Sequence, residues 1–134
     1  MIFDFEALSK EFKLFYDAFS PETYGISMGR AAEQAAVDFD NLSDKEKLLV
    51  NEWFLELFSQ EKAYYGIPYL WVVEKLNDIR FIPLVKGYYK RLKKQHNKIF
   101  ETTIDGKIIR ARSNFTSDLV LCKNVIKALK SKNK

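Results

Sequence analysis

The chain has 134 residues, of which 47% are hydrophobic, 15% are aromatic and 30% are charged. This composition predicts one globular domain over residues 1–134 with a packed core, and it argues against a disordered chain. The longest uninterrupted apolar run is the seven-residue stretch Ile67–Val73, whereas a membrane helix needs about 20 residues, so we expect no membrane association. The N-terminal residues lack the basic and apolar stretches of a signal peptide, which predicts a cytoplasmic protein.

The charges are divided unequally along the chain. Residues 1–67 contain 6 Lys or Arg and 13 Asp or Glu, a balance of −7, and residues 68–134 contain 16 and 5, a balance of +11. A chain with an acidic part and a basic part has two candidate contact surfaces of opposite sign. Attraction between the two parts within one folded chain is the alternative explanation. A frayed tail is expected at residues 130–134.

The first helices are predicted from apolar spacing. Five apolar residues repeat at intervals of three and four, which predicts a helix from Asp4 to Phe19. These residues are Phe5, Leu8, Phe12, Phe15 and Phe19. A second helix should begin near Ser27, and its four small Ala side chains at positions 31, 32, 35 and 36 would allow a neighbouring helix to approach closely.

Capping and helix-breaking residues divide the middle of the chain. Ser43 and Glu46 form a capping box, which predicts the start of a central helix. Gly66 breaks that helix, and prolines at positions 68 and 83 mark the starts of the next two. Helices are therefore expected over about residues 43–62, 68–80 and 83–99.

The pattern then changes to that of a β-hairpin. Asp105-Gly106 tolerates the positive φ angles of a two-residue turn, and β-prone segments flank it. This predicts a hairpin near residues 100–111 with Glu101 opposite Arg110. A last amphipathic helix should follow, with Lys123, Lys127 and Lys130 on its outer side.

These elements together predict a mainly α fold, a single-domain helical bundle of five or six helices with one short β-hairpin. Segments 15–26 and 54–67 resemble each other in sequence, and both are expected to end a helix. Two such helical hairpins could pack as a compact bundle.

The basic helix is one candidate functional surface. Its cations fall on one helical face with Tyr and His between them, a composition suited to phosphate contacts and base stacking. Arginines of the hairpin could extend this surface. The candidate residues for binding DNA or RNA are Lys86, Lys90, Arg91, Lys93, Lys94, Lys98, Arg110 and Arg112. The alternative is a solvated face that keeps the protein soluble.

The acidic part and an aromatic cluster form the other candidate surface. Acidic residues between Asp38 and Glu56 could cover the cationic active site of another protein by charge complementarity. Tyr and Trp side chains near Gly66 could anchor a protein interface, although most of them are expected in the core. The candidate residues for binding a protein are Glu52, Glu56, Tyr64, Tyr65, Tyr69 and Trp71.

Catalytic, metal and cofactor motifs are not evident in the sequence. There is no phosphate loop, dinucleotide fingerprint or nucleophile elbow. The single His96 and the single Cys122 offer no metal-ligand spacing, and Cys122 is expected to be a small core residue. We therefore name no catalytic residue, metal or cofactor, and an enzyme is the less favoured hypothesis.

The sequence thus predicts non-catalytic binding of a macromolecule. The first hypothesis is a small inhibitor or immunity-type protein that neutralises a toxin or enzyme partner. The alternative is a DNA- or RNA-binding protein that uses the basic helix at residues 84–99 and the hairpin arginines.

Overall fold

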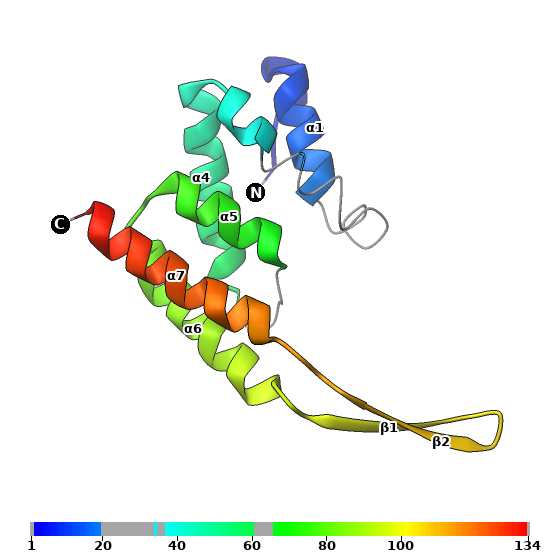
Figure 1. Cartoon of the computed structure of the whole chain (residues 1–134). Helices are drawn as coiled ribbons and strands as arrows, with labels where there is room; N and C mark the ends of the chain where they lie inside the picture. The colour runs from blue at the N-terminus through cyan, green and yellow to red at the C-terminus, as the bar shows by residue number, and fades with distance from the viewer. Residues whose placement is uncertain (1, 20–33, 35–36, 61–65, 134) are drawn as a thin grey trace.

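The computed structural model describes residues 2–19, 34, 37–60 and 66–133. It confirms the predicted fold class, because the described residues form mainly helices and one antiparallel two-stranded sheet (Figure 1). The elements that Figure 1 labels are α1 (Lys10–Phe19), α4 (Asp44–Phe58), α5 (Ile67–Leu76), α6 (Phe81–Gln95), β1 (Ile99–Ile104), β2 (Lys107–Arg112) and α7 (Thr116–Lys132).

The first predicted helix is divided in two. A short 3-10 helix, Phe5–Ala7, precedes α1, and the backbone at Leu8 is extended. Ser9 explains the division, because its hydroxyl accepts a hydrogen bond from the backbone N–H of Phe12 at 3.1 Å and so caps the start of α1. The predicted continuous helix from Asp4 is therefore wrong, although Phe12, Phe15 and Phe19 are buried as expected. The predicted helix start near Ser27 and the four Ala side chains lie outside the described residues.

Glu46 joins the starts of α1 and α4. The predicted capping box is confirmed, since the Ser43 hydroxyl accepts from the Glu46 N–H at 3.1 Å and the Glu46 carboxylate accepts from Ser43. The same carboxylate accepts from the N–H and hydroxyl of Ser9, at 2.9 and 2.7 Å. Burial raises the pKa of Glu46, but these hydrogen bonds outweigh it and leave the pKa below its usual value.

Helices α5 and α6 are separated by a sharp four-residue turn, residues 77–80. The prediction that the first of them reaches Arg80 is wrong, because Asn77 adopts a left-handed conformation with φ of 52° and ends α5. The second begins at Phe81, two residues before the predicted start at Pro83. Pro83 is tolerated there because the first-turn N–H groups of a helix have no intrahelical acceptor. The predicted end of α6 near residue 99 is wrong, because the backbone at His96 is extended and α6 ends at Gln95.

The hairpin is confirmed with its predicted register. Glu101 pairs with Arg110 across β1 and β2, and their side chains form an ion pair at 2.7 Å. Asp105 and Gly106 have φ angles of 52° and 78°, as a two-residue hairpin turn requires. α7 continues through Lys132, so the prediction that the tail frays from residue 130 is wrong for residues 130–132. Asn133 donates hydrogen bonds to the side chain of Asn77 and to the carbonyl of Leu129.

The aromatic core connects the acidic and basic parts through α4. On one side, the Phe54 ring lies 6.3 Å from that of Phe15 in α1; on the other, the Phe58 ring lies 5.8 Å from that of Tyr88 in α6. α7 packs mainly against α5 and α6. The central position predicted for the helix after Ser43 is therefore confirmed, and its burial fixes α6 relative to the rest of the molecule.

The shared role of Glu46 leads to a stability prediction. Replacement Glu46→Ala removes one acceptor from two helix starts and leaves the half-buried N–H and hydroxyl of Ser9 without it, which should lower the free energy of unfolding by about 2 kcal/mol. Urea denaturation followed by circular dichroism measures this change. Glu6→Ala, which removes an exposed carboxylate, is the control, and a loss of equal size in the control would contradict the capping role.

Candidate functional site

Exposed lysines of two neighbouring helices form one basic surface. The buried residues of α6 are Phe81, Val85, Tyr88 and Leu92, so the cations between them point outward. α7 likewise buries Cys122, Val125 and Leu129 and exposes its lysines. We refer to the exposed set as the α6–α7 basic surface: Lys86, Lys90, Lys93, Lys94, Lys123, Lys127 and Lys130.

The lysines of α7 were not among the sequence candidates for this surface. Their spacing predicted that they lie on the solvent-exposed side of the last helix, but the sequence did not show which other helix packs beside that helix. In the structure α6 and α7 run antiparallel, with Lys86 close to Lys130. Further along, the ring of Tyr89 lies between two ammonium groups, 5.8 Å from that of Lys93 and 5.6 Å from that of Lys123. The packing of two helices therefore produces two rows of cations.

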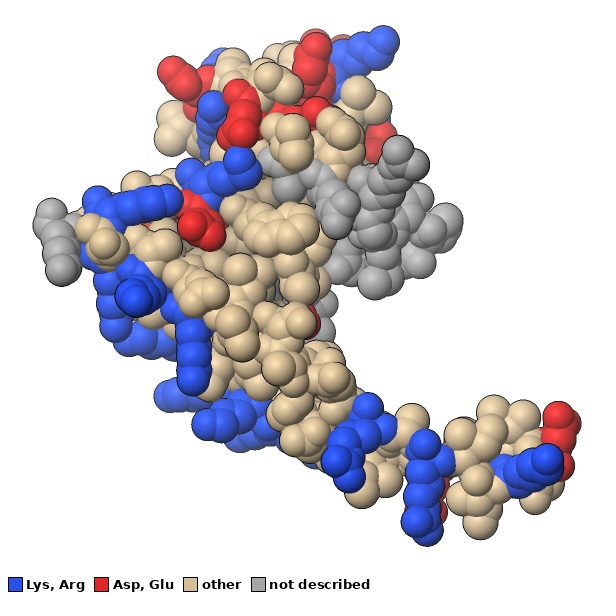
Figure 2. Space-filling view, viewed as in Figure 1, with Lys and Arg blue, Asp and Glu red and all other residues tan. Residues whose placement is uncertain are grey.

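The basic surface is electrostatically unbalanced. Among the described residues, none of its lysines forms an ion pair with a carboxylate. The positive charge of Lys130, with that of Lys90, lowers the pKa of Lys86. Figure 2 shows Lys and Arg side chains along the edge formed by α6 and α7 and onward to the hairpin, while most visible acidic side chains lie at the other end of the molecule. Such a surface is suited to a polyanion.

The other predicted basic residues fall into two groups. Lys98, Arg110 and Arg112 are exposed and continue the basic surface onto the hairpin, although Arg110 is also paired with Glu101. Arg91 is half-buried, and its guanidinium carbon lies 5.6 Å from the centre of the Tyr88 ring. Its Nε and Nη2 atoms are buried and have no hydrogen-bond partner. Arg91 is therefore turned away from the exposed rows.

The acidic candidate surface is partly neutralised by cations of the basic part. Glu52 forms an ion pair with Arg80 at 3.1 Å, and Asp40 forms one with Lys75 at 2.9 Å. Glu46 is buried, and Glu56 is exposed. Ion pairs between the acidic and basic parts of the chain thus neutralise some of the carboxylates that the protein-binding hypothesis requires.

The aromatic candidates do not form one exposed cluster. Tyr69 is buried and donates a hydrogen bond from its hydroxyl to the carbonyl of Phe19 at 2.7 Å, so it is a core residue. Trp71 is half-buried and lines a shallow, mainly apolar groove of about 380 Å³ between α5 and α7, together with Ile67, Val120 and Leu121. Tyr64 and Tyr65 lie outside the described residues.

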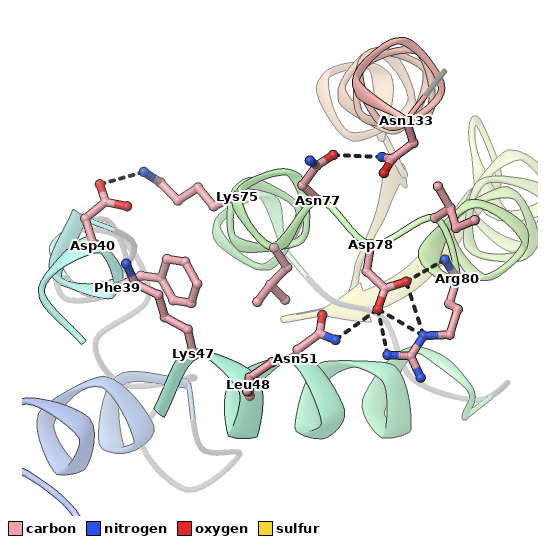
Figure 3. Close-up of a pocket in the computed structure, with 12 residues that line it drawn as sticks. Phe39, Asp40, Lys47, Leu48, Asn51, Lys75, Asn77, Asp78, Arg80 and Asn133 are labelled. Carbon is pink, nitrogen blue, oxygen red and sulfur yellow. Dashed lines mark hydrogen bonds and ion pairs between the residues drawn. The ribbon is translucent and has the colours of Figure 1, made fainter. Parts of the chain in front are cut away.

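A second, larger hollow of about 560 Å³ lies between α4, the α5–α6 turn and the end of α7 (Figure 3). Four of its charged side chains are paired, Asp40 with Lys75 and Asp78 with Arg80, and the ammonium group of Lys47 lies 5.7 Å from the centre of the Phe39 ring. The Arg80 guanidinium donates to Asp78 at 2.7 Å, and the Asn51 amide donates to the same carboxylate at 2.9 Å. The hydrogen bond from Arg80, opposed by burial and assisted by Asn51, lowers the pKa of Asp78 to about 2. Asp78 is therefore unsuited to proton transfer at neutral pH, because a general acid or base needs a pKa near the working pH.

Metal and thiol chemistry gain no support from the described part of the chain. It contains no group of three or more His, Cys, Asp or Glu side chains placed to hold a metal ion. Burial, together with the Asp118 carboxylate, raises the pKa of the Cys122 thiol to about 12, so this thiol is unreactive at neutral pH. The His96 Nδ1 accepts a hydrogen bond from the Phe115 N–H at 3.0 Å, which gives His96 a structural contact at the base of the hairpin.

Within the described residues, every helix is too short or too polar to traverse a lipid bilayer. Comparisons with protein-family models, curated proteins and solved structures find no significant match to this chain. Its function is therefore inferred from its own residues.

The low pKa of Asp78 leads to a prediction about pH. The pKa of the Asp78 carboxyl is about 2 in the folded chain, below its ordinary value of 3.8, which applies to the unfolded chain. The ionised carboxylate therefore stabilises the fold above about pH 4, and this contribution is lost as the pH falls toward 2. Asp78→Asn should lower the free energy of unfolding at pH 7 by about 2 kcal/mol, and its difference from the wild type should shrink toward pH 2. Chemical denaturation across this range measures the effect. Asp105→Asn, at an exposed turn position that also tolerates Asn, is the control; a pH-independent difference for Asp78→Asn would contradict the prediction.

Proposed function

We propose that this protein binds nucleic acid through the α6–α7 basic surface. The observation that carries the proposal is the lysine pairing across the two helices. Lys86 and Lys130 approach each other closely enough to lower the pKa of Lys86, and no described carboxylate pairs with either of them. A bound phosphate between two such ammonium groups would relieve their repulsion.

The arrangement of the cations supports a polyanionic ligand over a small anion. α6 contains no Asp or Glu, and α7 contains only Asp118, which is half-buried. Rows of lysines on two packed helices follow the length of both, so many phosphates of one chain molecule can be contacted together. Binding of this type gains its free energy from the release of counterions and weakens steeply with salt.

This proposal is tested with charge reversal on α6. Lys90→Glu together with Lys93→Glu should weaken binding to a fluorescein-labelled duplex by about tenfold or more at about 100 mM salt, and should reduce the slope of log K against log salt by about 2. Fluorescence anisotropy measures both quantities.

The matched control for this test is Lys10→Glu together with Lys45→Glu. These two lysines are exposed on α1 and α4, away from the basic surface, and the control changes the net charge by the same amount. Equal losses in the two double variants would show that only the net charge matters, and would contradict the proposed site.

A protein partner remains the second candidate because of one observation, the apolar groove beside Trp71. An inhibitor or immunity-type protein could seat an apolar side chain of its target there. This candidate predicts that Trp71→Ala abolishes capture of a protein partner while leaving nucleic-acid binding intact. The acidic surface gives this candidate less support, because Asp40 and Glu52 already form ion pairs with Lys75 and Arg80 of the same chain.

A further inference from the structure

We infer that the ligand is a nucleic-acid duplex and that the β1–β2 hairpin is a second arm that holds it. This inference rests on the proposed function and specifies the substrate class and the extent of the site. Four observations support it: the strands of the hairpin are exposed, the base of the hairpin is bonded to the end of α6, the cationic surface is about as long as one turn of duplex, and few aromatic rings are exposed on it.

The hairpin projects from the body of the molecule (Figure 1), and every residue of β1 and β2 is exposed. Several exposed residues are large and apolar, among them Phe100, Ile104 and Ile109. A two-stranded hairpin that buries nothing else is marginally stable in water. A ligand that lies along the arm would cover these exposed side chains and stabilise it.

The base of the hairpin is fixed to the end of α6. The N–H of Asn97 donates to the carbonyl of Ser113 at 2.9 Å, and the N–H of Ser113 donates to the carbonyl of Lys98 at 3.0 Å. The Ser113 hydroxyl also donates to the carbonyl of Gln95. These bonds hold the arm in a defined direction, so the cations at the end of α6 are followed directly by those of the hairpin.

The cations of the hairpin lie along its length. In the observed register, Arg110 and Arg112 share one face with Ile108, and Lys107 stands at the tip on the other face. Lys98 lies at the base, immediately before β1. Figure 2 shows basic side chains from the body outward onto the arm, with acidic atoms gathered mainly near its tip. The positive surface is therefore continuous from α7 and α6 onto the hairpin.

The combined length of this surface matches a turn of duplex. The stretch of α6 from Lys86 to its end rises about 14 Å at 1.5 Å per residue, and a six-residue strand adds about 20 Å. In Figure 1 the hairpin leads away from the C-terminal end of α6. The total of about 34 Å corresponds to about 10 base pairs of B-form DNA.

A single strand fits the surface less well than a duplex. Proteins that hold single strands stack successive bases on exposed aromatic rings. On α6, α7 and the hairpin, Phe100 is the one exposed aromatic side chain among the described residues, and Tyr89 is half-buried beside Lys93 and Lys123. The surface therefore offers many charges and few rings, which favours the paired phosphate backbones of a duplex.

The inference is tested by anisotropy with labelled DNA stem-loops whose stems have about 6, 10, 14 and 20 base pairs, and with a single strand of the same sequence as the longest stem. The wild-type chain should bind the longest stem about tenfold more tightly than the single strand. Its affinity should rise up to about 10 base pairs and then level off.

The hairpin variant is Lys107→Ala with Arg112→Ala, which leaves the Glu101–Arg110 pair and the register intact. It should lose the gain in affinity between the shortest and the 10-base-pair stems, and its salt slope on the longest stem should fall by about 2. Lys10→Ala with Lys45→Ala is the control and should behave as the wild type.

Two results would overturn the inference while leaving the proposed function in place: equal or tighter binding of the single strand, or a hairpin variant with an unchanged length dependence. If the wild-type chain bound none of the probes at about 50 mM salt, the proposed function would fail, and the inference would fail with it.

Discussion

The apolar seam between α6 and α7 is the interaction on which the basic surface depends. α6 buries a narrow stripe of residues spaced by three and four, and α7 buries a matching stripe that ends at Leu129. Burial of large apolar side chains contributes about 2 kcal/mol each, which is ample to hold lysines of two helices beside one another despite their repulsion. The close approach of Lys86 and Lys130 is thus a consequence of core packing, and the free energy that it costs is available to be recovered when an anion binds.

The division of charge along the chain has two different outcomes in the fold. Part of it is consumed internally, because Arg80 and Lys75 of the basic part pair with Glu52 and Asp40 of the acidic part. Asp40, Lys75 and Arg80 of these pairs line the larger hollow (Figure 3). The remaining cations, on α6, α7 and the hairpin, lie beyond the reach of those carboxylates. Attraction between the acidic and basic parts therefore explains the charges at the larger hollow, but it does not explain the cations of the α6–α7 basic surface.

Local chemistry made several elements predictable from the sequence. The hairpin register followed from Asp105-Gly106, and the start of α4 followed from Ser43 and Glu46, because each signal acts within a few residues. The errors arose where a distant partner decides the outcome. Ser9 begins α1 with the help of Glu46, which lies 37 residues away, and Tyr69 is buried against the rings of Phe19 and Phe54, where its hydroxyl donates to the Phe19 carbonyl. The contribution of Lys123, Lys127 and Lys130 was missed for the same reason, since helix neighbours are set by tertiary packing.

The proposed ligand-binding face consists of the α6–α7 basic surface and the hairpin. The most direct measurement is a heteronuclear NMR titration of the backbone amides of the whole chain with a duplex of about 12 base pairs. Binding at this face should shift the amide signals of α6, the hairpin and the outer side of α7, while those of α1 and of the groove beside Trp71 stay in place. Shifts centred on the Trp71 groove or on α4, with α6 unaffected, would contradict it.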